Sequence, residues 1–524
     1  MKTPSNRRDF LSQVGRGMIT ATVGSSLAAE LGLAADADTD TEAGNNTLSF
    51  GGWEPLVALM QETPADRLLP LLAEKLAAGV PLDRLVGAAA LANARSFGGE
   101  DYIGFHTMMA LAPSLHMARA CIGRERPLPV LKVLYRNTAR IQARGGRATE
   151  TLQSVTAATG APEADRAPEW LRAAVRAKDK TRAEAALAAL AQRSPDEAFN
   201  ALLHTVHDHT DVHRVVLPYR AWELLDVVGR EHAHTLLRQS VRYCVDAERG
   251  PNSTVESEPR ALLGTLMEKH ELISRAVGTR RAEDAWVEDL SRTLFESSPA
   301  DAAAAAAAAL AEGFSPDAIG EAISLAANQL VLRDPGRTPR DESPGKPVGS
   351  VHGDSIGVHA SDSANAWRNM ARVANARNTF ACLILGAYQV AMDRVNRGGD
   401  FLNLTPLPVQ GHVDGVKATD PAALLAEADE AIRQNMQARA AAIVHRYGYL
   451  GHAPGPVFDL MLSYAISEDG SLHGEKYFRT ASMEFAATRP TYRWRQLTAL
   501  ARVTASEYGR PAPGIAEARS LLKV

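Results

Sequence analysis

Residues 101–106, Asp-Tyr-Ile-Gly-Phe-His, recur with few changes at 354–359, where the chain reads Asp-Ser-Ile-Gly-Val-His. In both places Met-Ala-Arg follows at the same distance from the histidine, at 117–119 and at 370–372. Two weaker matches, one before these segments and one after them, keep the same order along the chain. Because chance does not readily preserve the order of several blocks, the pattern predicts a tandem duplication.

The matched blocks divide the chain into a first half at 55–250 and a second half at 290–510. Two halves of a duplicated fold commonly pack about a pseudo-twofold axis. We therefore expect a tandem-duplicated helical bundle with pseudo-twofold symmetry. The alternative is an α-solenoid, in which the same similarity marks stacked repeats that contact only their neighbours.

Helical patterns fill both halves. Leucines recur at helix spacing between Leu68 and Leu76, and eight alanines stand in a row from Ala302 to Ala309. Alanine is the best helix former. The alternation of apolar and polar residues that is typical of strands is nearly absent. The sequence therefore predicts an all-α fold.

The first residues resemble a twin-arginine (Tat) secretion signal. Arg7 and Arg8 precede a Phe-Leu pair, a short and weakly apolar stretch follows at 17–29, and Ala35-Asp36-Ala37 is a small-x-small site of the kind that signal peptidases read. The resemblance implies that residues 1–37 are a signal peptide, that the Tat export machinery is a partner, and that the protein is periplasmic or exported. An ordinary amphipathic N-terminal helix is the alternative.

The rest of the chain has the composition of an acidic protein. Residues 38–50 are acidic and rich in Thr and Asn, which predicts a disordered linker. The whole chain has a net charge of −4, and the signal holds four basic and three acidic residues, so the mature protein has about −5. Such a chain lacks the basic footprint that nucleic acid requires, and no stretch after the signal is long and apolar enough to span a bilayer. We expect no nucleic-acid partner and no membrane span in the mature chain.

Histidines are the side chains that the duplication singles out. His106 and His359 occupy the same place in the two halves, each after an Ile-Gly pair and each at the start of a predicted helix. Two such rings at a symmetric interface could supply ligands to one metal ion or to a metal pair. The alternative is a pair of buried rings that donate hydrogen bonds to backbone carbonyls.

A second concentration of histidines lies at 204–213, with four imidazoles and two carboxylates in ten residues. This composition is typical of a transition-metal site, although a solvated polar loop is the alternative. The matching stretch of the second half keeps one histidine, His473, together with Glu468 and Asp469. The predicted metal ligands are His106, His207, His209, His213, His359 and His473. The carboxylates predicted to hold the second nitrogens of the rings are Asp101, Asp208 and Asp354.

The helical, histidine-bearing segments, such as Ile103-Gly104-Phe105-His106, are similar to those of questin oxidase-like proteins. Imidazoles with one or two carboxylates suit iron, copper or zinc. The resemblance and these side chains together predict a metal-dependent oxidoreductase or oxygenase that acts on a small-molecule substrate at a site between the halves. A Walker loop and a nucleophile elbow are both absent from the sequence. The alternative is a non-enzymatic α-solenoid that serves as an interaction module.

Overall fold

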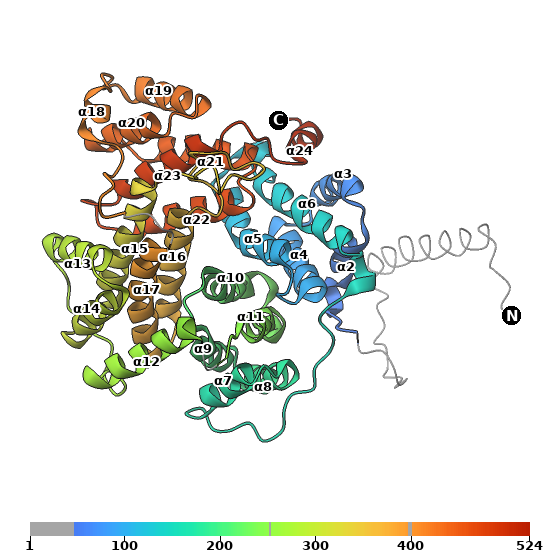
Figure 1. Ribbon diagram of the computed structural model, residues 1–524. Helices are drawn as coiled ribbons and strands as arrows, with labels where there is room; N and C mark the ends of the chain where they lie inside the picture. Colours follow the sequence, from blue (N-terminus) through green and yellow to red (C-terminus); the bar gives the residue numbers. More distant parts are fainter. Residues whose placement is uncertain (1–46, 251–252, 397–400) are drawn as a thin grey trace, which may run out of the picture. The chain divides into compact units, whose positions relative to one another are not determined.

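Helices make up the regular secondary structure of the residues that the computed structural model describes, which are 47–250, 253–396 and 401–524. These residues form 23 α-helices, α2 to α24, with four short 3-10 helices, isolated β-bridges and no sheet (Figure 1). The predicted all-α fold is confirmed. The predicted signal peptide at 1–37, with Arg7 and Arg8, lies outside the described residues, as does most of the predicted linker at 38–50.

Leu48–Val524 folds as one compact unit. Its first helices are α2 Glu54–Glu62, α3 Ala65–Ala77, α4 Leu82–Phe97, α5 Tyr102–Ala120, α6 Leu128–Ala143, α7 Ala167–Arg176, α8 Lys180–Arg193, α9 Pro195–Val206, α10 Val212–Val228, α11 Ala233–Ala247 and α12 Thr254–Lys269. The others are α13 Asp284–Glu296, α14 Pro299–Ala311, α15 Pro316–Arg333, α16 Ile356–Val373, α17 Ala376–Asn396, α18 Gln410–Asp414, α19 Pro421–Arg433, α20 Gln437–Tyr449, α21 Gly455–Ser467, α22 His473–Ala487, α23 Trp494–Glu507 and α24 Ile515–Leu522.

Capping residues explain where several of these helices begin. The hydroxyls of Ser298 and Ser315 accept hydrogen bonds from the first-turn N–H groups of α14 and α15, and a proline takes the first position of each helix. The alanine run lies in α14, which packs against α17. Because alanine side chains are small, the two helices can approach each other closely.

Four helices from distant parts of the sequence meet at the centre of this unit. α5 packs against α10 and α22, and α16 packs against the same two helices (Figure 1). The central helices thus come from both of the predicted halves. This packing differs from that of an α-solenoid, in which each repeat contacts only its neighbours.

The helices α5 and α16 each begin close against the helix that precedes them. A Cβ atom at Gly104 would lie 2.5 Å from the ring of Phe97, the last residue of α4. A Cβ atom at Gly357 would lie 2.6 Å from the backbone of Val331 in α15. A side chain at either position would collide with its neighbour, which explains why glycine stands at the same place in both repeated segments.

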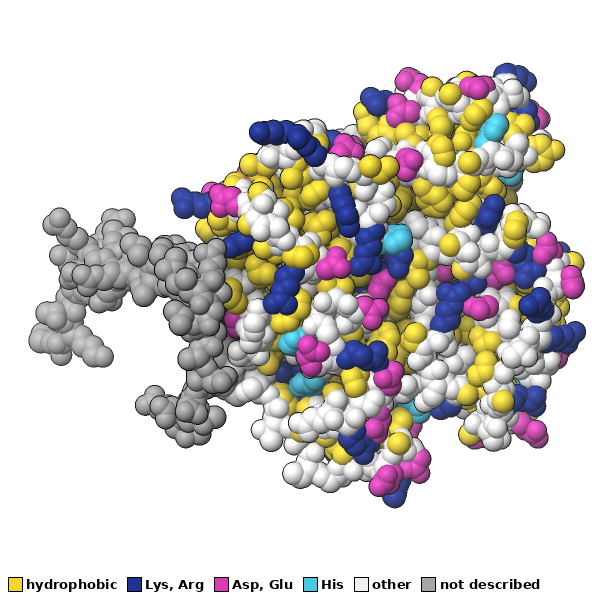
Figure 2. Space-filling model, turned by 180° about the vertical axis from the view of Figure 1, so that it is seen from behind, with side chains coloured by type: hydrophobic (Ala, Val, Ile, Leu, Met, Phe, Trp, Pro, Cys, Tyr) yellow, Lys and Arg dark blue, Asp and Glu magenta, His cyan; other side chains and the backbone are white. Residues whose placement is uncertain are grey.

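Charges of both signs are mixed on the surface. Figure 2 shows Lys and Arg side chains interspersed with Asp and Glu over one face of the molecule. Of the helices in the described residues, none is both long enough and apolar enough to cross a membrane.

Candidate metal centre

Each of the four central helices contributes one histidine to a cluster of imidazole rings. The centroid of the His106 ring in α5 lies 4.9 Å from that of His213 in α10 and 5.1 Å from that of His473 in α22. The centroid of the His359 ring in α16 lies 5.7 Å from that of His213 and 5.1 Å from that of His473. We call these four side chains the four-histidine cluster.

All four rings stand near the N-terminal ends of their helices. His473 is the first residue of α22, His213 the second of α10, His359 the fourth of α16 and His106 the fifth of α5. The peptide dipoles of a helix place partial positive charge at its N-terminus. This charge disfavours a protonated imidazolium and favours the neutral ring, which is the form that binds a metal.

Hydrogen bonds fix the orientation of the rings. The Nδ1 atom of His106 donates to the carbonyl oxygen of Tyr102 over 2.7 Å, and Nδ1 of His473 donates to that of Ser471 over 3.0 Å. A carbonyl can only accept, so in both rings Nδ1 carries the proton and Nε2 carries the lone pair. Nδ1 of His213 lies 3.8 Å from a carboxylate oxygen of Asp211. Contacts of this kind to the second nitrogen are typical of metal-binding histidines.

The Nε2 atoms are the candidate ligands. Nε2 of His359 lies 3.1 Å from Nε2 of His473 and donates a hydrogen bond to it, because the proton of the His473 ring is on Nδ1. When two nitrogens bind one ion at about 2.05 Å, they lie about 2.9 Å apart for an N–metal–N angle of about 90° and about 3.4 Å apart for the tetrahedral angle. The distance between the two Nε2 atoms falls between these values. The buried Nε2 atoms of His106 and His213 have no hydrogen-bond partner among the described residues.

The rings do not yet enclose a single point. Among the described residues, no three His, Cys, Asp or Glu side chains are already gathered at coordination distance. Binding therefore requires the rings to close in by rotation of their side chains. The four nitrogens are therefore candidate ligands that the structure does not gather into an assembled site.

Burial keeps the rings neutral. It lowers the pKa of His106 and His473 well below the ordinary value, and the charge of Lys476 lowers both further. Burial also lowers the pKa of His213 to about 4, against the opposing effect of Asp211. Three of the four rings therefore remain unprotonated at neutral pH.

The chain is strained immediately before His473. Ser471 and Leu472 both have positive φ values, 53° and 66°, in the left-handed region that non-glycine residues seldom adopt. The turn aims the Ser471 carbonyl at Nδ1 of His473. Backbone strain of this kind is commonly concentrated at functional sites.

Two tyrosines support the cluster, and neither stood out in the sequence as a site residue. Tyr102 is 55% exposed, and its ring centroid lies 4.5 Å from that of His106, so this residue lies between the cluster and the surface. The Tyr243 hydroxyl in α11 donates to Asp211 over 2.8 Å. Asp211 in turn caps α10 through the N–H groups of His213 and Arg214.

His207 and His209, which the sequence grouped with these ligands, lie in other settings. The His207 ring stacks on Trp367 with centroids 5.9 Å apart, and its Nε2 lies 3.6 Å from the Cys382 sulfur. His209 is partly buried, and the charges that act on it include those of Arg214 and Asp211. Density of histidine in the sequence did not predict which rings meet, because neighbouring residues point in different directions.

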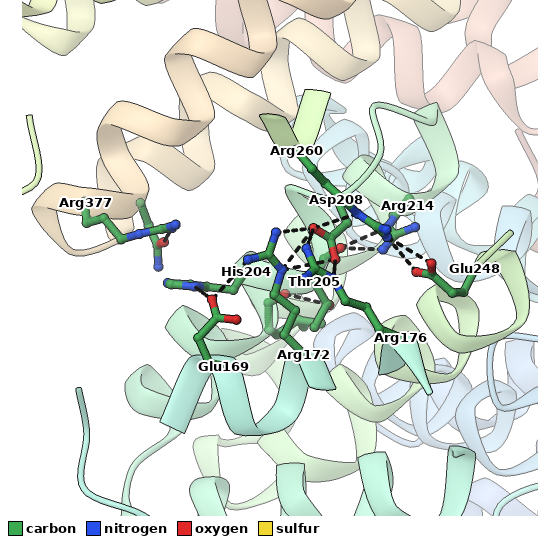
Figure 3. Close-up of polar contacts among 12 residues, drawn as sticks. Glu169, Arg172, Arg176, His204, Thr205, Asp208, Arg214, Glu248, Arg260 and Arg377 are labelled. Atoms are coloured by element: carbon green, nitrogen blue, oxygen red, sulfur yellow. Dashed lines mark hydrogen bonds and ion pairs between the residues drawn. The ribbon is translucent and has the colours of Figure 1, made fainter. Parts of the chain in front are cut away.

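Asp208 also has a different role from the predicted one. Its buried carboxylate accepts hydrogen bonds from Arg172 and Arg176 of α7 and forms an ion pair with Arg260 of α12 (Figure 3). Arg260 also binds Glu248 at the end of α11. This cluster ties three helices together and holds the pKa of Asp208 at about 2.

The prediction that Asp101 and Asp354 hold ring nitrogens is likewise wrong. Asp101 caps α5 and binds Arg140 over 2.6 Å, and Asp354 binds Lys346 over 2.8 Å. Backbone carbonyls and Asp211 contact the second nitrogens instead. Carboxylates next to basic side chains preferentially form ion pairs, and the sequence did not show these pairings.

No protein-family model, curated protein or solved structure matches this chain. The similarity to questin oxidase-like proteins therefore stays a prediction.

Proposed function

We propose that this protein is a metal-dependent oxidoreductase or oxygenase that binds a transition-metal ion through His106, His213, His359 and His473. The observation that carries the proposal is the orientation of the rings. Backbone carbonyls hold Nδ1 of His106 and His473, and the Nε2 atoms of His359 and His473 face each other at 3.1 Å. The buried Nε2 of His106 carries a lone pair that has no partner among the described residues, and leaving it unsatisfied is costly for a ring with a purely structural role.

The donor set favours particular metals. Imidazole ligands suit copper, iron and zinc, and the three carboxylates that the sequence predicted beside the rings, Asp101, Asp208 and Asp354, are engaged by Arg or Lys side chains. A redox-active ion in such a site supplies electron-transfer or dioxygen chemistry when bound. Tyr102, at the exposed edge of the cluster, is the side chain that a small-molecule substrate would meet first.

We also propose that the two halves arose by duplication and are related by a pseudo-twofold axis. Matching contacts support this. Arg119 of α5 binds Asp83 of α4 over 3.2 Å, and Arg372 of α16 binds Asp317 of α15 over 2.9 Å. These are positions that the repeat aligns. Each half contributes two rings to the cluster, so the axis would pass through the site.

The test is metal analysis of the purified full-length protein. We expect about one equivalent of copper, iron or zinc in the wild type and a loss of at least tenfold in H359A and H473A. H412A is the matched control, because His412 is exposed on α18 and lies outside the cluster. Paramagnetic resonance then distinguishes copper or iron from zinc. Metal-free wild-type protein that does not take up any of the three ions would overturn the proposal.

A further inference from the structure

A surface groove lies between segments that are distant in the sequence. Its walls are the last turn of α3, the start of α4, the end of α24 and the short 3-10 helix η2 Gly123–Glu125 together with Pro127. The helix α24 packs against both α3 and α6, so packed helices frame the groove (Figure 1). The groove has a volume of about 690 Å³, and small-molecule sites usually measure about 300–1,000 Å³. It is therefore large enough for a small ligand.

Most of the groove lining is apolar and still partly open to water. Its half-buried apolar side chains include Leu76, Val80, Leu82 and Leu522. These side chains pack against the core of the unit. Leu521, in the same lining, is 37% exposed. A ligand with an apolar part would remove this surface from water, which is favourable in proportion to the area covered.

One side of the groove carries two arginines. Arg124 and Arg126 both belong to the segment that contains η2, and both side chains are exposed. Neither side chain forms a hydrogen bond or an ion pair with any residue in the described part of the chain. Two guanidinium groups are therefore available to a ligand on this side.

The acidic side chains beside the groove are already engaged by other arginines. Asp83, which belongs to the lining, forms an ion pair with Arg119 over 3.2 Å. Glu125 forms an ion pair with Arg519 over 3.5 Å. Each of these pairs has no net charge, so the charges of the two arginines of the lining are not compensated by either acid. A negatively charged group on the ligand would complement them.

We propose that this groove binds a fatty acid, with its alkyl chain against the apolar walls of α3 and α24 and its carboxylate beside Arg124 and Arg126. A guanidinium matches a carboxylate through two parallel N–H donors, whereas an alkyl chain needs only apolar contact. An apolar wall with one positively charged side suits an amphiphile that has a single anionic head. The proposal does not depend on metal binding by the four-histidine cluster.

The experiment is a calorimetric titration of the full-length protein with three probes. Decanoate has both the chain and the carboxylate, decanol has only the chain, and acetate has only the carboxylate. We expect decanoate to bind at about one equivalent, decanol to bind about fivefold more weakly, and acetate to show no binding, because exposed ion pairs add little to an apolar contact and do not replace it.

The arginines are tested by the double variant R124Q/R126Q. Its affinity for decanoate should fall about fivefold, to that for decanol, and its affinity for decanol should stay unchanged. The matched control is R281Q/R340Q, because Arg281 and Arg340 are exposed and lie outside the groove. The midpoint of thermal unfolding should be that of the wild type in both double variants, so a lower affinity cannot result from unfolding.

The apolar wall is tested by A77W. Ala77 is the exposed last residue of α3 and belongs to the lining, so a tryptophan there should fill part of the groove and weaken decanoate and decanol alike, by about tenfold. The matched control is A426W, because Ala426 is exposed on α19 and lies outside the groove. Wild-type affinity for decanoate in A77W would show that the ligand binds elsewhere and would overturn the proposal.

Two further results would also overturn it. Equal affinities of the wild type for decanoate and decanol would show that the arginines do not recognise the carboxylate. Binding of phosphatidylglycerol vesicles that is lost in R124Q/R126Q, by a protein that binds no decanoate, would assign the arginines to a membrane surface. Loss of metal binding in H473A with unchanged decanoate affinity would separate this site from the proposed metal centre and support the groove as an independent site.

Discussion

Burial keeps the ring of His213 neutral in the folded protein. Its Nε2 has no partner in the described structure, and Asp211 lies beside its Nδ1. The side chain is 13% exposed, so desolvation is the main cause of its low pKa. Protonation of this residue therefore links stability to pH and, under the proposed function, metal binding to pH as well.

We expect the free energy of unfolding of the metal-free protein to fall as the pH drops from about 6.5, the unfolded pKa of histidine, to about 4, the folded pKa of His213. Between these values the unfolded chain binds more protons than the folded one, so acid destabilises the fold; above them both states are neutral and the contribution is constant. A pKa difference of this size corresponds to a loss of about 3 kcal/mol in the free energy of unfolding.

Urea unfolding at several pH values checks this expectation. Other buried histidines contribute in the same range, so H213F should remove part of the pH dependence and not all of it. An H213F profile identical to that of the wild type would contradict a His213 pKa near 4.

The left-handed turn before His473 gives a second prediction at the scale of single residues. S471G should raise the free energy of unfolding by about 0.5–1 kcal/mol, because glycine adopts positive φ without strain. Metal affinity should stay within about threefold, because the carbonyl that holds His473 remains. S471V should lower stability by about 1–2 kcal/mol and weaken metal binding at least tenfold.

The matched control for this turn is Lys178, an exposed residue with a φ of 56° that lies outside the cluster. K178V should destabilise the protein by a similar amount with metal affinity unchanged. Chemical unfolding and metal titration measure the two effects separately. Equal losses of metal affinity in S471V and K178V would show that general instability, and not the orientation of His473, is responsible.

At the scale of elements, the starts of α5 and α16 explain how much could be predicted. The repeated glycine could be recognised because tight packing restricts the choice of residue there, and the repeated histidine because both copies lie in one cluster of rings. His213 and His473 also stood out through their spacing. Ring orientation could not be predicted, because it depends on the carbonyls of Tyr102 and Ser471, whose directions follow from the folded backbone.

Substitution of the two repeated glycines tests this packing. G357A should lower the free energy of unfolding by about 3 kcal/mol, because its Cβ atom would meet the backbone of Val331. G104A should cost about 1 kcal/mol, because the ring of Phe97 can shift. Gly264 lies in α12 with nothing within 4 Å of its added Cβ atom, so G264A should be neutral or stabilise by up to about 1 kcal/mol. Thermal denaturation ranks the stability of the three variants. If G104A lowered stability as much as G357A, the explanation based on the backbone of Val331 and the ring of Phe97 would be contradicted.

At the scale of the whole molecule, the helical class could be predicted from composition and helical spacing. The packing of α5 on α22 could not, because it depends on long-range contacts that no local pattern reveals.

The prediction that belongs to this scale concerns export. Arg7→Lys combined with Arg8→Lys should leave the precursor in the cytoplasm, because the resemblance to a twin-arginine signal implies that both guanidinium groups are recognised. Arg16→Lys, in the same segment but outside the motif, is the control. Fractionation of the host cells measures the outcome, and normal export of the double variant would refute the signal.

If the proposed function holds, the four rings of the cluster also determine when the protein can mature. His106 is made early, but His473 is the last of the four in a chain of 524 residues. An ion that needs all four rings can therefore be captured only late in biosynthesis, after nearly the whole polypeptide has been translated and folded. Under the proposed function, metal loading becomes a checkpoint that a truncated or half-folded chain cannot pass.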